Sequence, residues 1–529
     1  MKCLVGILMA VSASAGAQMC APPEQAPIVS YPSGTIIHNV GTSDLTVTTK
    51  SEKCRQLVKQ GFALLHCFWF NESVRSFRDA TKEDPECAIA WCGLNAIETM
   101  PWNRQSAYKD EAEFAIKRAV QLSESASKVE QALIVSFRVR SLSDDDRKGA
   151  FRTAMEKVVA ENPSEMEPRL LLAGVLTQLC MNDRSLESGE IQNELKSVYA
   201  LIEPVLKRDP RNAAALHYHI HAMEGSRPEL AIPSAKLLPE VASASAHMVH
   251  MAGHIYNTVG MWTEGDKVFK RSQEVGEAYA KELGKTPNEA DWNYGHNNDY
   301  FSVNLMEQGR VKEAIKLQSF GGRKAEFAWR NSNWKELLEI VKENEKSKQS
   351  MFYRGLAFAY LGQLEDAKKA LKVVLGEANT TPPPRTGKVS PWLRQEETRS
   401  FELEGLITFL SGEKDRGIQI LRRAVESYDR IEYDEPSSYM RPPHESLVFA
   451  LRSMNKPKDA LKVLDAYAKV KKNSAWTYYL RGRCYEDLRD EKSALKWYRE
   501  YQKIWTNPDP ELEPVAHVEK FMRDMARKG

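Results

Sequence analysis

The chain has 529 residues, of which 42% are apolar and 28% charged, a composition typical of a folded soluble protein and unlike that of a disordered chain. Its 74 basic and 72 acidic residues leave a formal net charge of +2. A charge this small, without a basic stripe interleaved with aromatic residues, argues against binding to nucleic acid or to an anionic membrane.

The N-terminus predicts a secretory signal peptide over residues 1–17. Met1 and Lys2 supply a short positive start, residues 3–11 (CLVGILMAV) form an apolar core, and residues 12–17 (SASAGA) offer small residues of the A-x-A cleavage kind. The apolar core is too short for a membrane span, and no other stretch reaches the roughly 18 apolar residues that a span needs. We expect a secreted or periplasmic protein; a buried N-terminal helix is the alternative.

Cleavage at that site removes Cys3 and leaves seven cysteines. The number is odd, and the spacing shows neither a CxxC pair nor a disulfide framework. We expect most of these residues to be buried thiols; a single bridge among Cys67, Cys87 and Cys92 is the alternative.

The next segment, residues 18–50, contains four prolines and alternating Thr and Val residues. This composition predicts an extended lead-in that packs along the first helices. From Ser51 onward the apolar residues follow a helical period.

A 34-residue frame begins near the start of the helical region. Gly61 stands at position 8 of that frame, Ser73 at position 20, Phe77 at 24, Ala80 at 27 and Pro85 at 32. Small residues at positions 8 and 20 allow two helices to cross closely, and bulky residues fill the gaps between neighbouring pairs.

The frame recurs along the chain. Gly355, Gly405 and Gly482 fit the position of Gly61, and Ala460 and Ala494 lie 34 residues apart. The pattern resembles the tetratricopeptide repeat (TPR), and the resemblance covers nearly all of the chain after the lead-in. It implies an all-α, TPR-like superhelical solenoid of antiparallel helix pairs. We expect an N-terminal array over residues 51–325 and a C-terminal array over residues 326–529, the latter with a Pro-rich loop at residues 380–392.

Histidines are concentrated in one part of the first array. Seven of the eleven lie between residues 217 and 296, far more than an even spread would place there: His217, His219, His221, His247, His250, His254 and His296. In the repeat frame, His247, His250 and His254 occupy positions 2, 5 and 9 of the first helix of one repeat. By the same frame, His217 and His221 take positions 5 and 9 of the preceding repeat, and His296 takes position 2 of the following one.

These positions line the concave groove in tetratricopeptide proteins, where peptides bind, so the resemblance implies that six histidines face one space. Pairs three or four residues apart project from one helix face and form ready-made chelates. His219 departs from this spacing because two residues turn a helix by about 200°, and we interpret it as a structural residue or one behind the ligands. The sequence therefore predicts a metal site formed by His217, His221, His247, His250, His254 and His296.

The identity and number of the ions stay open at this stage. An imidazole-dominated site favours copper or zinc, whereas a carboxylate from Glu224 or Asp299, each three residues after a histidine, would favour iron or manganese. One ion with three or four ligands and a dinuclear site with six are both compatible with the spacing. The remaining alternative is a metal-free groove whose histidines bind a peptide or each other.

Candidate catalytic residues lie beside the histidines. Glu224 is placed to orient an imidazole or to act as a general base. Tyr256 follows His254 by two residues and is our second catalytic candidate. Trp292, Tyr294 and Asn297 are expected to line the pocket.

The histidine stretch also resembles a group of secreted, mainly bacterial tetratricopeptide proteins that carry HYxIHAxE followed by HLVHMxxHIYxxxGxY. Here residues 217–224 read HYHIHAME, residues 247–256 read HMVHMAGHIY, and a later HN pair matches residues 296–297. Two departures are His219, where the pattern has tyrosine, and Trp262, where it has a terminal tyrosine. The resemblance strengthens the site without identifying a reaction.

Other catalytic signatures are absent from the sequence, including the phosphate-binding GxxxxGK[ST] and the GxSxG elbow. Our leading hypothesis is a secreted copper- or iron-dependent oxidoreductase acting on a small molecule or a peptide, with a zinc hydrolase as the less favoured enzyme. The alternatives are a peptide-binding adaptor without catalysis, with a protein partner on the repeat surface, and a metal storage or sensing protein.

Overall fold

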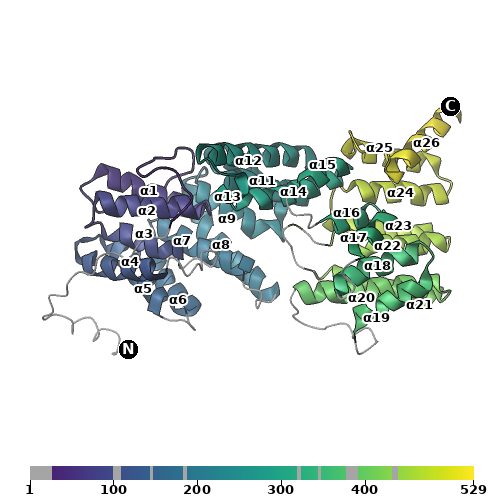
Figure 1. Ribbon diagram of the computed structural model, residues 1–529, viewed down its shortest axis with the longest axis horizontal. Coiled ribbons are helices and arrows are strands. Elements are labelled where there is room, and N and C mark those ends of the chain that lie inside the picture. Colours follow the sequence, from purple (N-terminus) through teal and green to yellow (C-terminus); the bar gives the residue numbers. More distant parts are fainter. Residues whose placement is uncertain are drawn as a thin grey trace.

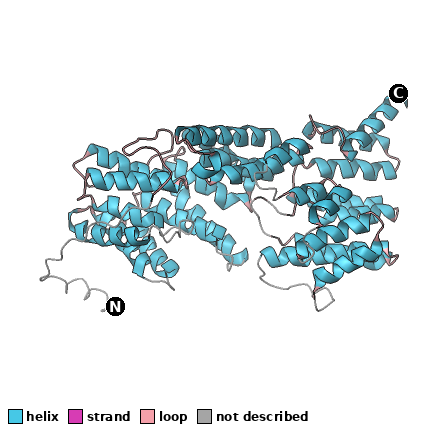
Figure 2. Cartoon of the chain, viewed as in Figure 1, coloured by secondary structure: helices cyan, strands magenta, loops and turns pink. Residues whose placement is uncertain are grey.

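The structure, a computed structural model of the chain, describes residues 27–98, 109–142, 147–182, 188–317, 323–342, 347–376, 391–431, 436 and 439–528. The predicted signal peptide (residues 1–17) and residues 380–390 of the predicted Pro-rich loop lie outside these ranges. Within the described ranges the regular structure is entirely helical (Figure 2). No helix among the residues searched is long and apolar enough to cross a membrane.

The helices of the first half run in chain order as follows: α1 (Glu52–His66), α2 (Phe70–Glu83), α3 (Ala88–Glu98), α4 (Lys109–Leu122), η2 (Ser123–Ser125), α5 (Lys128–Leu142), α6 (Arg147–Glu161), α7 (Glu167–Asn182), α8 (Ser188–Arg208), α9 (Ala213–Glu224), η3 (Pro228–Ala231), α10 (Ile232–Val241), α11 (Ala246–Val259), α12 (Trp262–Glu282), α13 (Pro287–Ala290), α14 (Asn293–Glu307) and α15 (Val311–Leu317). The second half continues with α16 (Lys324–Arg330), α17 (Trp334–Val341), α18 (Lys348–Tyr360), α19 (Leu364–Leu375), α20 (Pro391–Leu410), α21 (Lys414–Tyr428), α22 (Pro443–Ser453), α23 (Pro457–Val470), α24 (Ala475–Asp487), α25 (Glu491–Ile504) and α26 (Glu513–Lys528).

Consecutive helices pack as antiparallel pairs, and the pairs stack along the chain (Figure 1). The predicted all-α solenoid is therefore confirmed. The C-terminal pair α24–α25 packs back onto the chain near α12 and α14: the Trp505 indole donates to the Glu307 carbonyl over 2.8 Å, and the Trp262 indole donates to the Asn473 carbonyl over 2.8 Å. These contacts join α25 to the end of α14 and the start of α24 to the start of α12.

The repeat frame corresponds to real packing contacts. A Cβ added to Gly61 would lie 2.7 Å from the ring of Phe77, and one added to Gly253 would overlap the ring of Phe269. Both rings are fully buried. Position 8 must be small because the bulky residue at position 24 of the paired helix occupies the space of its side chain.

In several helix pairs a left-handed residue stands one or two positions after the first helix ends. Gly260 (φ 75°) directly follows α11, and Gly309 (φ 73°) lies two positions after the end of α14, as expected for a conformation that glycine adopts without steric cost. In the first pair the residue is Phe68, with φ 55°. A bulky side chain in this conformation costs about 1–2 kcal/mol of backbone energy.

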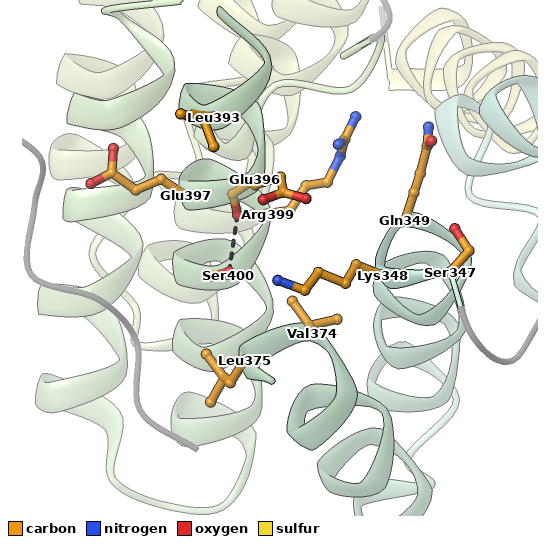
Figure 3. Close-up of a pocket in the computed structure, with 10 residues that line it drawn as sticks. All are labelled: Ser347, Lys348, Gln349, Val374, Leu375, Leu393, Glu396, Glu397, Arg399 and Ser400. Carbon is orange, nitrogen blue, oxygen red and sulfur yellow. Dashed lines mark hydrogen bonds between the residues drawn. The ribbon is translucent and has the colours of Figure 1, made fainter. Parts of the chain in front are cut away.

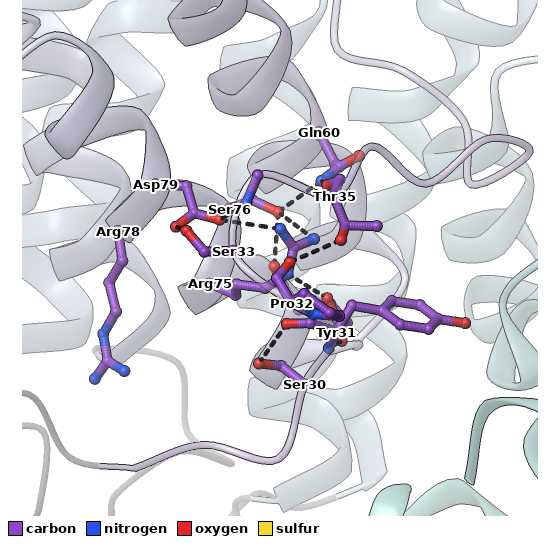
Figure 4. A network of polar contacts seen from close by, with 12 residues as sticks. Ser30, Tyr31, Pro32, Ser33, Thr35, Gln60, Arg75, Ser76, Arg78 and Asp79 are labelled. Atoms are coloured by element: carbon purple, nitrogen blue, oxygen red, sulfur yellow. Dashed lines mark hydrogen bonds and ion pairs between the residues drawn. The ribbon is translucent and has the colours of Figure 1, made fainter. Parts of the chain in front are cut away.

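The lead-in is extended over its described part, residues 27–50, and is held on the first helices by buried polar groups (Figure 4). The Tyr31 amide donates to Glu72 over 2.6 Å, and the Gly34 amide donates to Asp79 over 2.7 Å. Further along, the Ser43 hydroxyl donates to Glu167 on α7 over 2.5 Å. The segment thereby bridges α2 and α7.

The described cysteines all have free thiols: Cys54, Cys67, Cys87, Cys92, Cys180 and Cys484. Every one except Cys180 is buried. Most of these residues are thus buried thiols as expected, and the alternative bridge among Cys67, Cys87 and Cys92 does not form.

Candidate metal centre

Three neighbouring helices supply the six histidines. α9 and α14 both contact α11, which lies between them. The Asn212 side chain caps α9 by accepting from the Ala215 amide, and the Ser245 side chain caps α11 by accepting from the Met248 amide. These caps satisfy backbone donors at the helix starts and fix where the histidine faces begin.

The histidines divide into two groups of three. His217, His221 and His247 form the first triad, and His250, His254 and His296 form the second; within each triad, one ligand atom per residue lies within 4.8 Å of the others. Each triad takes two histidines four residues apart on one helix and a third from the first turn of the next of the three helices. The second triad thus repeats the arrangement of the first, shifted by one repeat.

The Nε2 atoms of five of the six histidines face one another within the triads. In the first, His217 Nε2 lies 3.1 Å from His221 Nε2 and 3.3 Å from His247 Nε2. In the second, His250 Nε2 lies 2.8 Å from His254 Nε2, and the His296 ring centroid lies 4.9 Å from that of His250. Ligand nitrogens around one tetrahedral ion lie about 3.3 Å apart when the metal–nitrogen bonds are about 2.0–2.1 Å.

The opposite ring nitrogens, Nδ1, face oxygen acceptors in five of the six histidines. His217 Nδ1 donates to the His66 carbonyl over 2.7 Å. His247 and His250 donate to the side-chain oxygens of Asn293 and Asn297, each over 3.0 Å. Such contacts hold the proton on Nδ1 and leave the Nε2 lone pair for a metal.

Glu224 serves both triads. One of its carboxylate oxygens accepts from His221 Nδ1 over 2.8 Å, and the other accepts from His254 Nδ1 over 2.7 Å. The carboxylate is buried, 4% exposed. These are the contacts of a residue that orients ligand imidazoles, so the general-base role expected for Glu224 stays a prediction.

The site is enclosed by protein. Five of the six imidazoles are 5% exposed or less, and His296 is the most exposed of them. Burial, followed by the neighbouring His221, holds the pKa of His217 well below its usual value. Burial also lowers the pKa of His247 to about 3 and that of His296 to about 4. These three imidazoles are therefore neutral at pH 7, as metal ligands must be. The sequence placed these residues along an open concave groove, but aromatic side chains cover them.

Phe68 covers the first triad. Its ring centroid lies 4.7 Å from that of His217, 5.5 Å from that of His247 and 6.1 Å from that of His221. The residue is 1% exposed, and its left-handed backbone directs the ring into the cluster. Sequence reasoning missed Phe68 because it lies far from the histidines along the chain.

Tyr300 packs on the second triad. Its ring stacks on His254 with centroids 4.2 Å apart, and its hydroxyl lies 3.3 Å from His254 Nδ1. In the sequence, only helical spacing could have indicated Tyr300, because it follows His296 by one turn.

Tyr256, our second catalytic candidate, is 5% exposed, and burial followed by the nearby Glu264 raises its pKa. Its catalytic role also stays a prediction.

The other expected lining residues have different environments. Trp292 lies against His247, with centroids 5.2 Å apart, and is 45% exposed. Tyr294 points elsewhere and donates to Glu277 over 2.9 Å. His219 bonds to Ser234 over 2.8 Å, outside both triads, in agreement with the structural role assigned to it. Among the residues searched, Asp299 belongs to neither triad.

A second layer, also missed from the sequence, supports the first triad. His66 bonds through Nδ1 to the Tyr218 hydroxyl over 2.7 Å and through Nε2 to Glu167 over 2.9 Å. Glu167 in turn accepts from Ser43 of the lead-in. This network fixes the end of α1. The His66 carbonyl at that end accepts the hydrogen bond from His217 Nδ1.

Comparison with known proteins gives the following matches. A family model described as tetratricopeptide repeat matches residues 450–508. No curated protein sequence matches the chain. Among solved structures, the Cut9–Hcn1 hetero-tetramer of the APC/C is 15% identical, with 88% of this chain and 76% of that chain covered and a TM-score of 0.30. Yeast Tom70 is 12% identical, with 90% and 97% covered and a TM-score of 0.28. A tetratricopeptide repeat protein from Parabacteroides merdae is 12% identical, with 65% and 98% covered and a TM-score of 0.25.

Proposed function

We propose that this chain, an α-solenoid built of tetratricopeptide repeats, is a metal-dependent oxidoreductase whose buried histidines bind copper or iron and whose substrate is a small molecule or a peptide. The observation that carries the proposal is the convergence of Nε2 lone pairs in the interior. The facing Nε2 atoms lie 2.8–3.3 Å apart. The proton of each of these rings is on Nδ1, where an oxygen acceptor holds it. Two such lone pairs repel each other unless a cation lies between them.

The donor set supports copper first. Imidazole nitrogens supply both triads, and Glu224 uses its two oxygens on ligand Nδ1 atoms. Iron sites that activate dioxygen combine two histidines with a carboxylate, an arrangement that neither triad makes among the residues searched. Zinc would need a base for hydrolysis, and the candidate base Glu224 is already engaged. A copper or iron ion held by these histidines would supply electron transfer from the substrate to dioxygen.

Residues of the chain contribute orientation and access. Three histidines per triad leave a coordination position open for a small ligand. Phe68 and Tyr300 exclude water from the two triads, and both are nearly fully buried. The partly exposed pair Trp292 and His296, whose ring centroids lie 5.8 Å apart, marks the side from which a substrate approaches. The secreted or periplasmic location predicted from residues 1–17 is part of this proposal.

Metal analysis of the purified chain, after reconstitution with copper, iron or zinc in separate samples, tests the proposal. We expect bound copper and, with a reductant present, oxygen consumption above that of the free ion. The double variant His250→Ala/His254→Ala should lose the metal bound at the second triad and keep its helical content. His219→Gln, on the same helix as the first triad but outside it, is the matched control and should retain both properties. A chain that binds none of the three metals refutes the proposal.

A second candidate function, peptide binding without catalysis, has its own observation. A cavity of about 360 Å³ lies between α18, α19 and α20 (Figure 3), lined by Ser347, Lys348, Gln349, Val374, Leu375, Leu393, Glu396, Glu397, Arg399 and Ser400. Lys348 points into it, a cation that suits a carboxylate-bearing peptide. Anisotropy titration with a fluorescent acidic peptide pool should detect binding that Lys348→Ala weakens, while the exposed Lys368→Ala does not.

A further inference from the structure

We propose that the six histidines hold two metal ions, one in each triad, with Glu224 orienting a ligand of each. This inference rests on the proposed function and adds the number of ions and their separate ligand sets. It is carried by the geometry of the two triads and by the hydrogen bonds behind them.

The site is repeated along the chain. His217 and His221 on α9 combine with His247 at the start of α11, and His250 and His254 on α11 combine with His296 at the start of α14. The helix α11 therefore gives one ligand to the first triad and two to the second. Because the second set is the first set displaced by one repeat, each triad is a complete unit with three ligands of its own.

The two sets of histidines form separate clusters of facing nitrogens. Within a triad, the ring centroids of His217 and His221 lie 4.9 Å apart, and those of His250 and His254 lie 4.8 Å apart. The third ring of the second triad, His296, lies 5.8 Å from His254. Across the triads, His247 and His250 are 6.0 Å apart, and His221 and His254 are 6.1 Å apart. The facing Nε2 distances of 2.8–3.3 Å fall inside each triad and match two ligands of one ion.

Hydrogen bonds behind the imidazole rings fix which ring nitrogen carries the proton. The Asn297 amide nitrogen donates to the Phe269 carbonyl over 3.0 Å, so its oxygen must face His250 Nδ1. The Asn293 amide nitrogen lies 3.4 Å from the Ser272 hydroxyl, which itself donates to the Ala246 carbonyl and can therefore only accept from Asn293. Both amides thus present oxygen, and both imidazoles carry their proton on Nδ1.

The same logic applies at Glu224, where an ionised carboxylate accepts and does not donate. Its two oxygens fix His221 of the first triad and His254 of the second in the same tautomer. Five Nε2 lone pairs are thereby directed inward in two clusters of buried side chains. One ion can satisfy only one cluster, since a tetrahedral site takes at most four ligands.

Copper stoichiometry of the full chain, measured by elemental analysis after reconstitution and removal of loose metal, tests this inference. We expect two copper ions per chain in the natural sequence. His247→Gln should lower the ratio to one by opening the first triad, and His296→Gln should lower it to one by opening the second. The combined variant should bind none, whereas His219→Gln should keep two.

The outcomes separate the two proposals. A natural chain that binds no copper overturns this inference, and one that binds none of copper, iron and zinc overturns the proposed function as well. One copper per chain supports the proposed function and overturns this inference. Two coppers that are both lost in either single variant overturn the assignment of one ion to each triad. If His247→Gln or His296→Gln loses the helical circular dichroism of the parent, His217→Gln replaces it for the first triad and His250→Gln for the second.

Discussion

Replacing Glu224 by glutamine isolates the role of the carboxylate shared by the two triads. The amide has nearly the same shape, but it keeps one acceptor oxygen and places an NH₂ donor where the second oxygen was. In the parent, the two oxygens accept from His221 and His254 over 2.8 and 2.7 Å. In the variant one of these Nδ1–H groups faces another donor, so that histidine must turn its ring or move its proton to Nε2. Either change removes it as a ligand.

The magnitude follows from what an orienting partner contributes to a metal site. Loss of such a partner weakens metal binding 10- to 100-fold, which corresponds to about 1.4–2.7 kcal/mol. Because the amide oxygen still serves one imidazole, we expect the full loss at one ion and a smaller one at the other. Competition titration with a copper chelator of known affinity measures both steps.

A matched control is Glu229→Gln, which removes a carboxylate on the neighbouring η3 that pairs with Lys472 at the surface. It should leave both copper affinities unchanged. Unchanged affinities in Glu224→Gln as well would refute the orienting role. If turnover disappeared while both affinities were kept, the general-base role expected from the sequence would be supported instead.

Three further predictions concern the cluster and its cover. Because burial lowers the pKa of His247 to about 3 and that of His296 to about 4, the unfolded chain binds protons that the folded chain does not, and the stability of the metal-free protein should fall as pH drops below about 6.5. Each such histidine should lower the free energy of unfolding by about 1 kcal/mol between pH 6.5 and 5.5. A urea midpoint that does not change over this interval would contradict the lowered pKa values. Phe68→Ala should lower the free energy of unfolding, measured by heat or urea, by about 3–5 kcal/mol. Phe68→Gly should be less destabilising than the loss of its side chain implies, because glycine relieves about 1 kcal/mol of left-handed backbone strain. Equal stabilities for the two variants would argue against that strain. Tyr300→Phe should retain the copper content of the parent, since Glu224 still holds His254 Nδ1; loss of one copper on elemental analysis would instead make the hydroxyl part of the site.

Much of this molecule was determined by the sequence alone, because repeats act locally. The 34-residue spacing set the helix pairs, and the contact between Gly253 and Phe269 is the packing that positions 8 and 24 predicted. The same frame put the six histidines on three successive first helices, since side chains three or four residues apart share a helix face. His219 was assigned outside the cluster by that rule, and its bond to Ser234 agrees.

Contacts between elements distant in the chain decided the rest. The division into two triads depends on how closely α9, α11 and α14 approach, and the choice of Nδ1 partners depends on which carbonyl or amide each imidazole meets there. Phe68 reaches the cluster from the first repeat, about 150 residues before the histidines, through a backbone conformation that its residue type disfavours. A periodic pattern specifies which face of a helix is occupied; only the assembled stack determines what covers that face, which ring nitrogen keeps its proton, and where two lone pairs meet.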